Sequence, residues 1–133
     1  MINIDYEKVP GEQLPQLYIS DDERVLVKKH IILPFVIKVL EHDKKIFSGL
    51  PLKASVPYIE KLDHRIIEVF QDVNSVQKQL REQSIKVYEV KRDNKMGYWE
   101  YILRGNRHEM GFMWSIVRTE VELYLMEKFG LRY

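Results

Sequence analysis

The chain has 133 residues, of which 45% are hydrophobic and 31% charged, and it contains no cysteine. A chain of this length is expected to form one domain that buries about 68% of its unfolded surface, enough for a core without metals or disulfides. The apolar content excludes intrinsic disorder. The absence of cysteine excludes thiol catalysis and cysteine-ligated metals, and the net charge of +1 argues against a strongly basic nucleic-acid binder.

The N-terminal residues 1–7 are acidic and no apolar stretch follows them, which argues against a signal peptide. The longest nearly continuous apolar run covers residues 31–37, whereas a membrane-spanning helix needs about 20 residues. We therefore expect a cytoplasmic protein with a single domain over residues 1–133, no membrane segment and no cofactor.

Residues 1–19 are expected to form an extended arm, because Pro10, Gly11 and Pro15 interrupt them and no helical period is present. Apolar residues alternate with polar ones over residues 2–6, a pattern that is compatible with a short strand. Such a strand would add to a sheet formed elsewhere in the chain.

A first helix is predicted over residues 20–48. Ser20 and Glu23 form a capping-box pattern at its start, in which each side chain bonds the backbone amide of the other residue. Apolar residues surround the helix from 25 to 40, so we expect it to be the central helix of the fold. Pro34 removes one helical hydrogen bond and predicts a kink or a split at this point.

A second helix is predicted over residues 55–83, with Ser55 or Val56 as its N-cap and Pro57 in its first turn. Its apolar side chains form one seam at spacings of three and four residues: Ile59, Leu62, Ile66, Val69, Val73, Val76 and Leu80. This seam favours packing against another helix of the same chain, and a homodimer seam is the alternative.

A β-hairpin is predicted over residues 85–104, because β-branched and aromatic residues dominate residues 85–92 and 98–104 around a short polar loop. A third helix is predicted over residues 106–129, with Asn106 as N-cap. Gly130 then predicts a Schellman ending.

The expected fold class is therefore α+β, with three long helices packed with a β-hairpin. The first helix is kinked or split near Pro34, and the strand within residues 2–6 is a further candidate member of the sheet.

The sequence contains no pattern for catalysis or metal binding. No serine lies in a nucleophile elbow, and the six glycines form no phosphate-binding loop. Glu60 and His64 have the spacing of a helical ligand pair, but they lie outside the apolar seam and are expected to face water. We predict no catalytic residue and no metal site, and favour a protein that is not an enzyme.

One anion-binding or ligand-binding site is predicted at Arg104, Asn106, Arg107 and His108. These residues would surround the N-terminus of the third helix, where backbone amides and the helix dipole favour a phosphate or carboxylate. The alternative is that both arginines pair with acidic residues and that His108 is an ordinary surface residue.

A nucleic-acid surface is an alternative at Lys91, Arg92, Lys95 and Tyr98. Residues 81–107 contain seven basic and four acidic residues, interleaved with aromatic residues that can stack on bases. Half-buried strands contain such aromatic residues for packing as well.

The function favoured by the sequence is that of a non-catalytic interaction or regulatory module. Residues 1–24 contain six acidic and two basic residues, so charge-guided self-association or binding of a protein partner is plausible. The alternatives are a nucleic-acid-associated regulator that uses the hairpin, and a ligand-binding protein or enzyme with its site at Arg104–His108.

Overall fold

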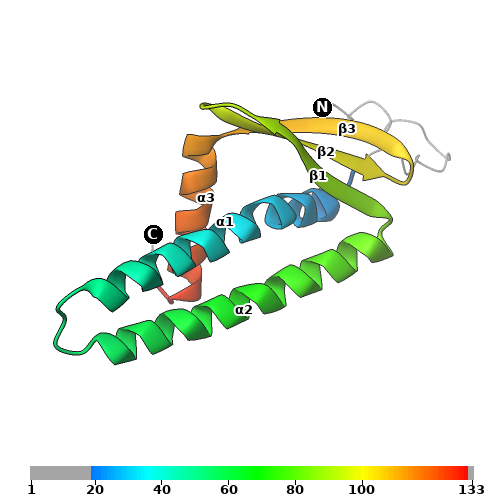
Figure 1. Ribbon diagram of the computed structural model, residues 1–133. Helices are drawn as coiled ribbons and strands as arrows, with labels where there is room; N and C mark the ends of the chain where they lie inside the picture. The colour runs from blue at the N-terminus through cyan, green and yellow to red at the C-terminus, as the bar shows by residue number, and fades with distance from the viewer. Residues whose placement is uncertain (1–18, 132–133) are drawn as a thin grey trace.

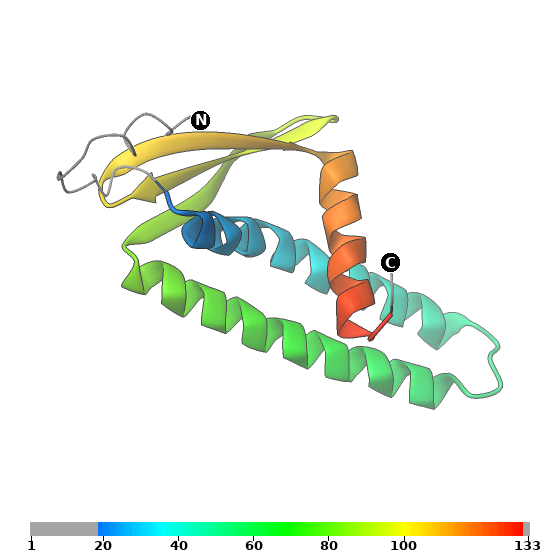
Figure 2. The ribbon, with the colours of Figure 1, turned by 180° about the vertical axis from the view of Figure 1, so that it is seen from behind.

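The computed structural model describes residues 19–131, so most of the predicted arm and its strand lie outside the described residues. The elements are α1 (Asp21–Gly49), α2 (Ser55–Glu82), β1 (Ile85–Arg92), β2 (Met96–Leu103), β3 (Asn106–Met113) and α3 (Trp114–Lys128). Helices α1 and α2 run side by side as a long antiparallel hairpin (Figure 1). The sheet covers one end of this hairpin. Helix α3 crosses α1 on the side that faces the viewer in Figure 2.

Helix α1 lies at the centre of the fold, as predicted. The Ser20 hydroxyl accepts from the Glu23 amide, and the Glu23 carboxylate accepts from the Ser20 amide, which confirms the capping box. A kink or a split was predicted at Pro34; the split does not occur, because α1 continues through this residue. A proline inside a helix lowers the stability of the helix by about 3 kcal/mol. The burial of the apolar side chains around it in α1 offsets this cost: Val27, Ile31, Leu33, Val36 and Leu40.

The apolar seam of α2 packs within the chain. Val69, Val76 and Leu80 are buried and belong to one core cluster with the residues of α1, while Leu62 and Ile66 are only partly buried against it. The predicted side-chain cap is absent, since Ala54 occupies the N-cap position of α2.

The prediction of three helices packed with a β-hairpin is wrong, because the structure has a third strand before the last helix. Arg104 and Gly105 have φ angles of 46° and 92°, and two residues with positive φ make the tight turn that joins antiparallel strands. The chain therefore reverses direction, and β3 pairs with β2 from Asn106 to Met113 in a sheet of order β1-β2-β3. Asn106 begins a strand, and α3 begins only at Trp114.

One face of the sheet packs on α1 through Trp99, Tyr101 and Leu103, which are buried. An aromatic cluster fills the corner between this face, α1 and α3, and its rings meet edge to face: Phe35, Trp99, Phe112 and Trp114. Gly97 makes room for the cluster, because a Cβ atom there would lie 2.5 Å from the Trp99 ring.

The end of α3 matches its prediction. The Gly130 amide donates to the Glu127 carbonyl and the Leu131 amide to the Met126 carbonyl. These two bonds define a Schellman motif.

Candidate functional site

The predicted anion site at Arg104–His108 is not at a helix N-terminus. Arg104 lies in the β2–β3 turn, where its guanidinium donates to both carboxylate oxygens of Glu23, at 2.9 and 3.3 Å, and to the Gln83 carbonyl. Burial alone would raise the pKa of Glu23, but hydrogen bonds from Arg104 and the Ser20 amide hold it below its ordinary value. This pairing of Arg104 with an acidic residue is the alternative that the sequence analysis gave.

The other three residues of that prediction point in different directions. Asn106 and His108 lie on the face of β3 that packs toward α1, where the His108 ring stacks on Tyr101 with centroids 4.9 Å apart. Arg107 lies on the outer face and pairs with the buried Glu100 at 3.2 Å. Anion binding here stays a prediction, without the helix dipole that motivated it.

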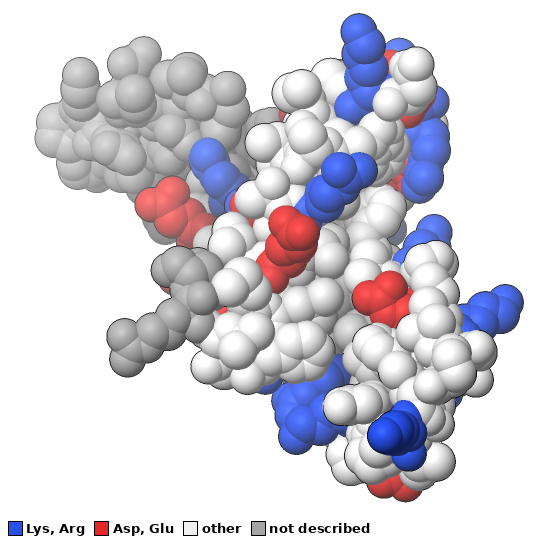
Figure 3. Space-filling model, turned by 90° about the vertical axis from the view of Figure 1, so that its left-hand side faces the viewer, with Lys and Arg blue, Asp and Glu red and all other residues white. Residues whose placement is uncertain are grey.

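The residues of the predicted nucleic-acid surface also divide between the two faces of the sheet. Lys91 pairs with Tyr98 on the outer face, with its ammonium 5.1 Å from the ring centre. Arg92 lies opposite Gly97 on the face toward the helices and covers the ring of Trp114. Figure 3 shows basic side chains gathered at the top of the molecule, near the β1–β2 turn to which Lys95 belongs. Nucleic-acid binding stays a prediction.

In residues 19–131, no group of three or more side chains of the metal-ligating kinds lies close enough to hold a metal ion. Glu60 and His64 are both exposed on α2. Within the same range, no helix is both long and apolar enough to cross a membrane.

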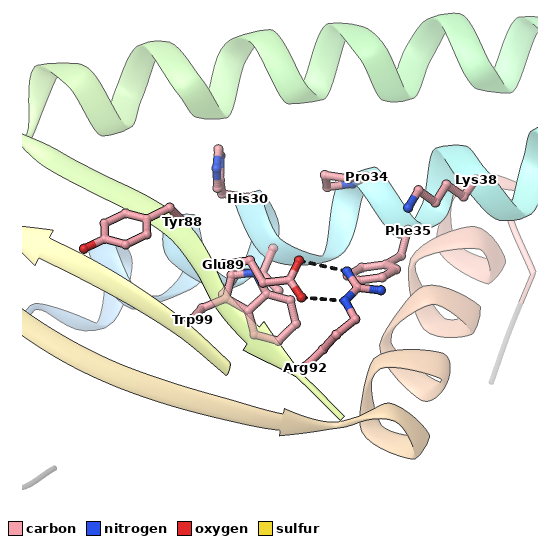
Figure 4. Close-up of a pocket in the computed structure, with 9 residues that line it drawn as sticks. His30, Pro34, Phe35, Lys38, Tyr88, Glu89, Arg92 and Trp99 are labelled. Carbon is pink, nitrogen blue, oxygen red and sulfur yellow. Dashed lines mark hydrogen bonds and ion pairs between the residues drawn. The ribbon is translucent and has the colours of Figure 1, made fainter. Parts of the chain in front are cut away.

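A small pocket lies between α1 and β1, and no sequence pattern predicted it. The cavity measures about 180 Å³ and is lined by His30, Phe35, Lys38, Glu89 and Arg92, among others. Figure 4 shows Lys38 of α1 and the bonded pair Glu89 and Arg92 of β1 around the rings of Phe35 and Trp99. No local motif indicates this pocket, because its two walls are some fifty residues apart in the sequence.

The end of the helical hairpin is the least covered part of the structure. The connected ends of α1 and α2 extend beyond the sheet and α3 (Figure 1). No residue from 41 to 68 is buried, although this stretch contains ten large apolar side chains: Ile46, Phe47, Leu50, Leu52, Val56, Tyr58, Ile59, Leu62, Ile66 and Ile67. Figure 3 looks onto this end and shows uncharged surface between scattered charged side chains.

Four of the exposed or half-buried apolar residues of α2 share one side of the helix, which we call the α2 stripe: Val56, Ile59, Ile67 and Phe70. At about 100° per residue these positions fall within about 80° of arc. The stripe adjoins the side that packs on α1 through Val69 and Val76, and Ile59 belongs to both, so the apolar surface of α2 is wider than its packed seam. Val56, Ile67 and Phe70 lie outside the predicted seam, whose regular spacing does not include them.

The chain matches the YhjD protein family over residues 18–133 and therefore belongs to that family. No curated protein and no solved structure matches it.

Proposed function

We propose that this member of the YhjD protein family is a non-catalytic, cytoplasmic interaction module that associates with a second copy of itself through the α2 stripe. The observation that carries the proposal is that residues 41–68 include ten large apolar side chains and no buried residue. Large contiguous apolar surfaces on a folded protein are typical of contact sites.

The charges of the hairpin end favour a second copy as the partner. Residues 41–68 contain five basic and five acidic residues, so two copies of this surface do not repel each other. A strongly charged partner would find no complementary field here. In addition, Lys44 already neutralises Asp63 at 2.7 Å, near the middle of the stripe.

The stripe is also complementary to itself. Two-fold symmetry makes residue i of one copy contact residue j of the other, and j contact i. If the axis passes near Asp63, two antiparallel α2 helices place Val56 opposite Phe70 and Ile59 opposite Ile67, because both pairs are centred on position 63. All four apolar positions then find apolar partners in a single register.

The expected affinity is modest. Val56, Ile67 and Phe70 are 64%, 55% and 47% exposed, so contact can bury about half of each side chain and stabilise the dimer by about 1 kcal/mol per residue. Eight side chains then contribute about 8 kcal/mol, and association itself costs at least about 4 kcal/mol. The net gain is then at most about 4 kcal/mol, so the dissociation constant should be about 1 mM or higher.

Sedimentation equilibrium at protein concentrations below and above this dissociation constant tests the proposal. The wild-type chain should pass from monomer to dimer, and Ile67→Asp should remain monomeric with an unchanged unfolding temperature. Ile116→Asp is the matched control, because Ile116 is similarly exposed, at 45%, but lies on α3. A wild-type chain that stays monomeric, or a dimer that Ile67→Asp leaves intact, would overturn the proposal.

A charge-exchange experiment tests the register. Val56→Glu and Phe70→Lys should each weaken the dimer, whereas the double variant should recover it, because each glutamate then faces a lysine of the second copy. If the double variant is as monomeric as the single ones, the proposed register is wrong.

A further inference from the structure

We propose that the pocket between α1 and β1 binds a small oxyanion, a phosphate or carboxylate group, between Lys38 and Arg92. This proposal is independent of the self-association described above, because the pocket lies beside the sheet and uses no residue of the α2 stripe.

Arg92 is oriented by its neighbours. Its Nε and Nη2 atoms donate to the two carboxylate oxygens of Glu89, at 2.7 and 2.8 Å, and its guanidinium carbon lies 5.1 Å from the centre of the Trp114 ring. A β-bulge between Glu89 and Lys91 shifts the register and places Glu89 and Arg92 on the same face of β1, toward α1. The remaining nitrogen, Nη1, has no hydrogen-bond partner among residues 19–131 and is available to a ligand.

Lys38 supplies the second cation from the opposite wall. Its ammonium lies 5.8 Å from the centre of the Phe35 ring, and it has no ion pair with any residue in the described part of the chain. Figure 4 shows the Lys38 side chain extending from α1 toward the guanidinium of Arg92. Both cations point into a space that contains only one carboxylate, that of Glu89, so the pocket has an excess of one positive charge.

The size and surroundings of the pocket limit the ligand. About 180 Å³ is less than the roughly 300–1,000 Å³ of sites for drug-sized molecules, so it suits a head group and not a whole cofactor. The rings of Phe35 and Trp99 form an apolar wall of the pocket, and the exposed side chains of Lys38 and Arg92 leave it open to a ligand from solvent. His30 borders the pocket on the side toward α2, and burial lowers its pKa, so its imidazole is neutral at pH 7.

The test is an NMR titration of the ¹⁵N-labelled full chain with inorganic phosphate, and separately with acetate, at constant ionic strength set with chloride. The amides of Lys38, Glu89 and Arg92 should shift and saturate. Saturation with phosphate alone identifies a phosphoryl group, and saturation with both salts identifies any oxyanion. Shifts that do not saturate with either salt would overturn the proposal.

Two variants connect the titration to the pocket. Lys38→Met should weaken binding at least about tenfold, which corresponds to about 1.4 kcal/mol, while the unfolding temperature stays unchanged. Lys45→Met is the matched control, because Lys45 is an exposed lysine two turns further along α1 and does not line the pocket. An equal loss of binding in both variants would show an unspecific charge effect and contradict the site.

Discussion

Replacing Glu23 by glutamine tests how firmly the start of α1 is joined to the sheet. The Glu23 carboxylate accepts from the Ser20 amide within the capping box and from Arg104 in the β2–β3 turn. Arg104 also donates to the Gln83 carbonyl at the end of α2. One carboxylate therefore joins the first turn of α1 to the β2–β3 turn of the sheet. Glu23→Gln keeps the shape of this side chain and removes its charge.

The magnitude follows from the burial of the pair. The side chains of Glu23 and Arg104 are 11% and 24% exposed, so the loss should be smaller than the roughly 3–5 kcal/mol for breaking a fully buried pair. We expect the free energy of unfolding at pH 7 to fall by about 2 kcal/mol. The corresponding decrease in the unfolding temperature is about 7 °C.

The difference between wild type and variant should depend on pH in one direction. The folded pKa of Glu23 lies below its ordinary value of 4.5, so its charge stabilises the fold fully above that value and loses its effect as pH falls through the folded pKa. Urea denaturation of both proteins between neutral and acidic pH should show the stability difference disappear at low pH.

A matched control and a double-mutant cycle complete the experiment. Asp22→Asn removes an exposed acid from the same helical turn and should change stability by less than about 0.5 kcal/mol. Arg104→Gly combined with Glu23→Gln should show a coupling energy of about 1–2 kcal/mol. If Glu23→Gln is as harmless as Asp22→Asn, or if the coupling is absent, the ion pair does not hold α1 to the sheet.

Three further substitutions test other parts of the fold. Ser84→Gly should raise the free energy of unfolding by about 0.5 kcal/mol in urea denaturation, because Ser84 follows α2 with a φ of 58°; a loss of stability would contradict this. Gly97→Ala should lower the free energy of unfolding by about 2 kcal/mol and weaken the near-ultraviolet circular dichroism of the tryptophans. The new methyl group would lie 2.5 Å from the Trp99 ring and 2.7 Å from the Trp114 ring. An unchanged spectrum would refute the close contact. Tyr124→Phe should cost about 1 kcal/mol and raise the pKa of Asp72 toward its ordinary value in an NMR titration, because the tyrosine hydroxyl donates to this carboxylate. A pKa that stays low would assign the effect to Lys128 and Lys29.

Local signals were sufficient for the two long helices and the first two strands. Ser20 and Glu23 lie three residues apart, and the apolar seam of α2 repeats within a single helix, so both patterns are complete in a short stretch of sequence. The residues of β3 are a contrasting case. The sequence spacing of a helix continues through Met110, Met113 and Val117. In the structure the burial of β3 alternates as in a strand. Hydrogen-bonded pairing with β2 therefore selects the strand over the helix.

The turn at Arg104 explains why this pairing was hard to predict. Tight two-residue hairpins are usually signalled by Asn-Gly or Asp-Gly, and arginine seldom adopts a positive φ. Here the distant Glu23 holds the guanidinium of Arg104 in place. The pocket between α1 and β1 is hard to predict for the same reason, since Lys38 and Arg92 come to line one pocket only when the sheet packs over α1.

The central position of α1 has a consequence for the order in which the protein can fold. The helix with the most buried residues comes before every element that covers it: α2 follows it directly, whereas α3, which also packs against it, ends only at Lys128. During synthesis α2 can cover part of α1 early, but the surface that α3 covers stays open until residue 128 has left the ribosome. Contacts between such distant segments slow folding and leave apolar surface open to aggregation in the meantime.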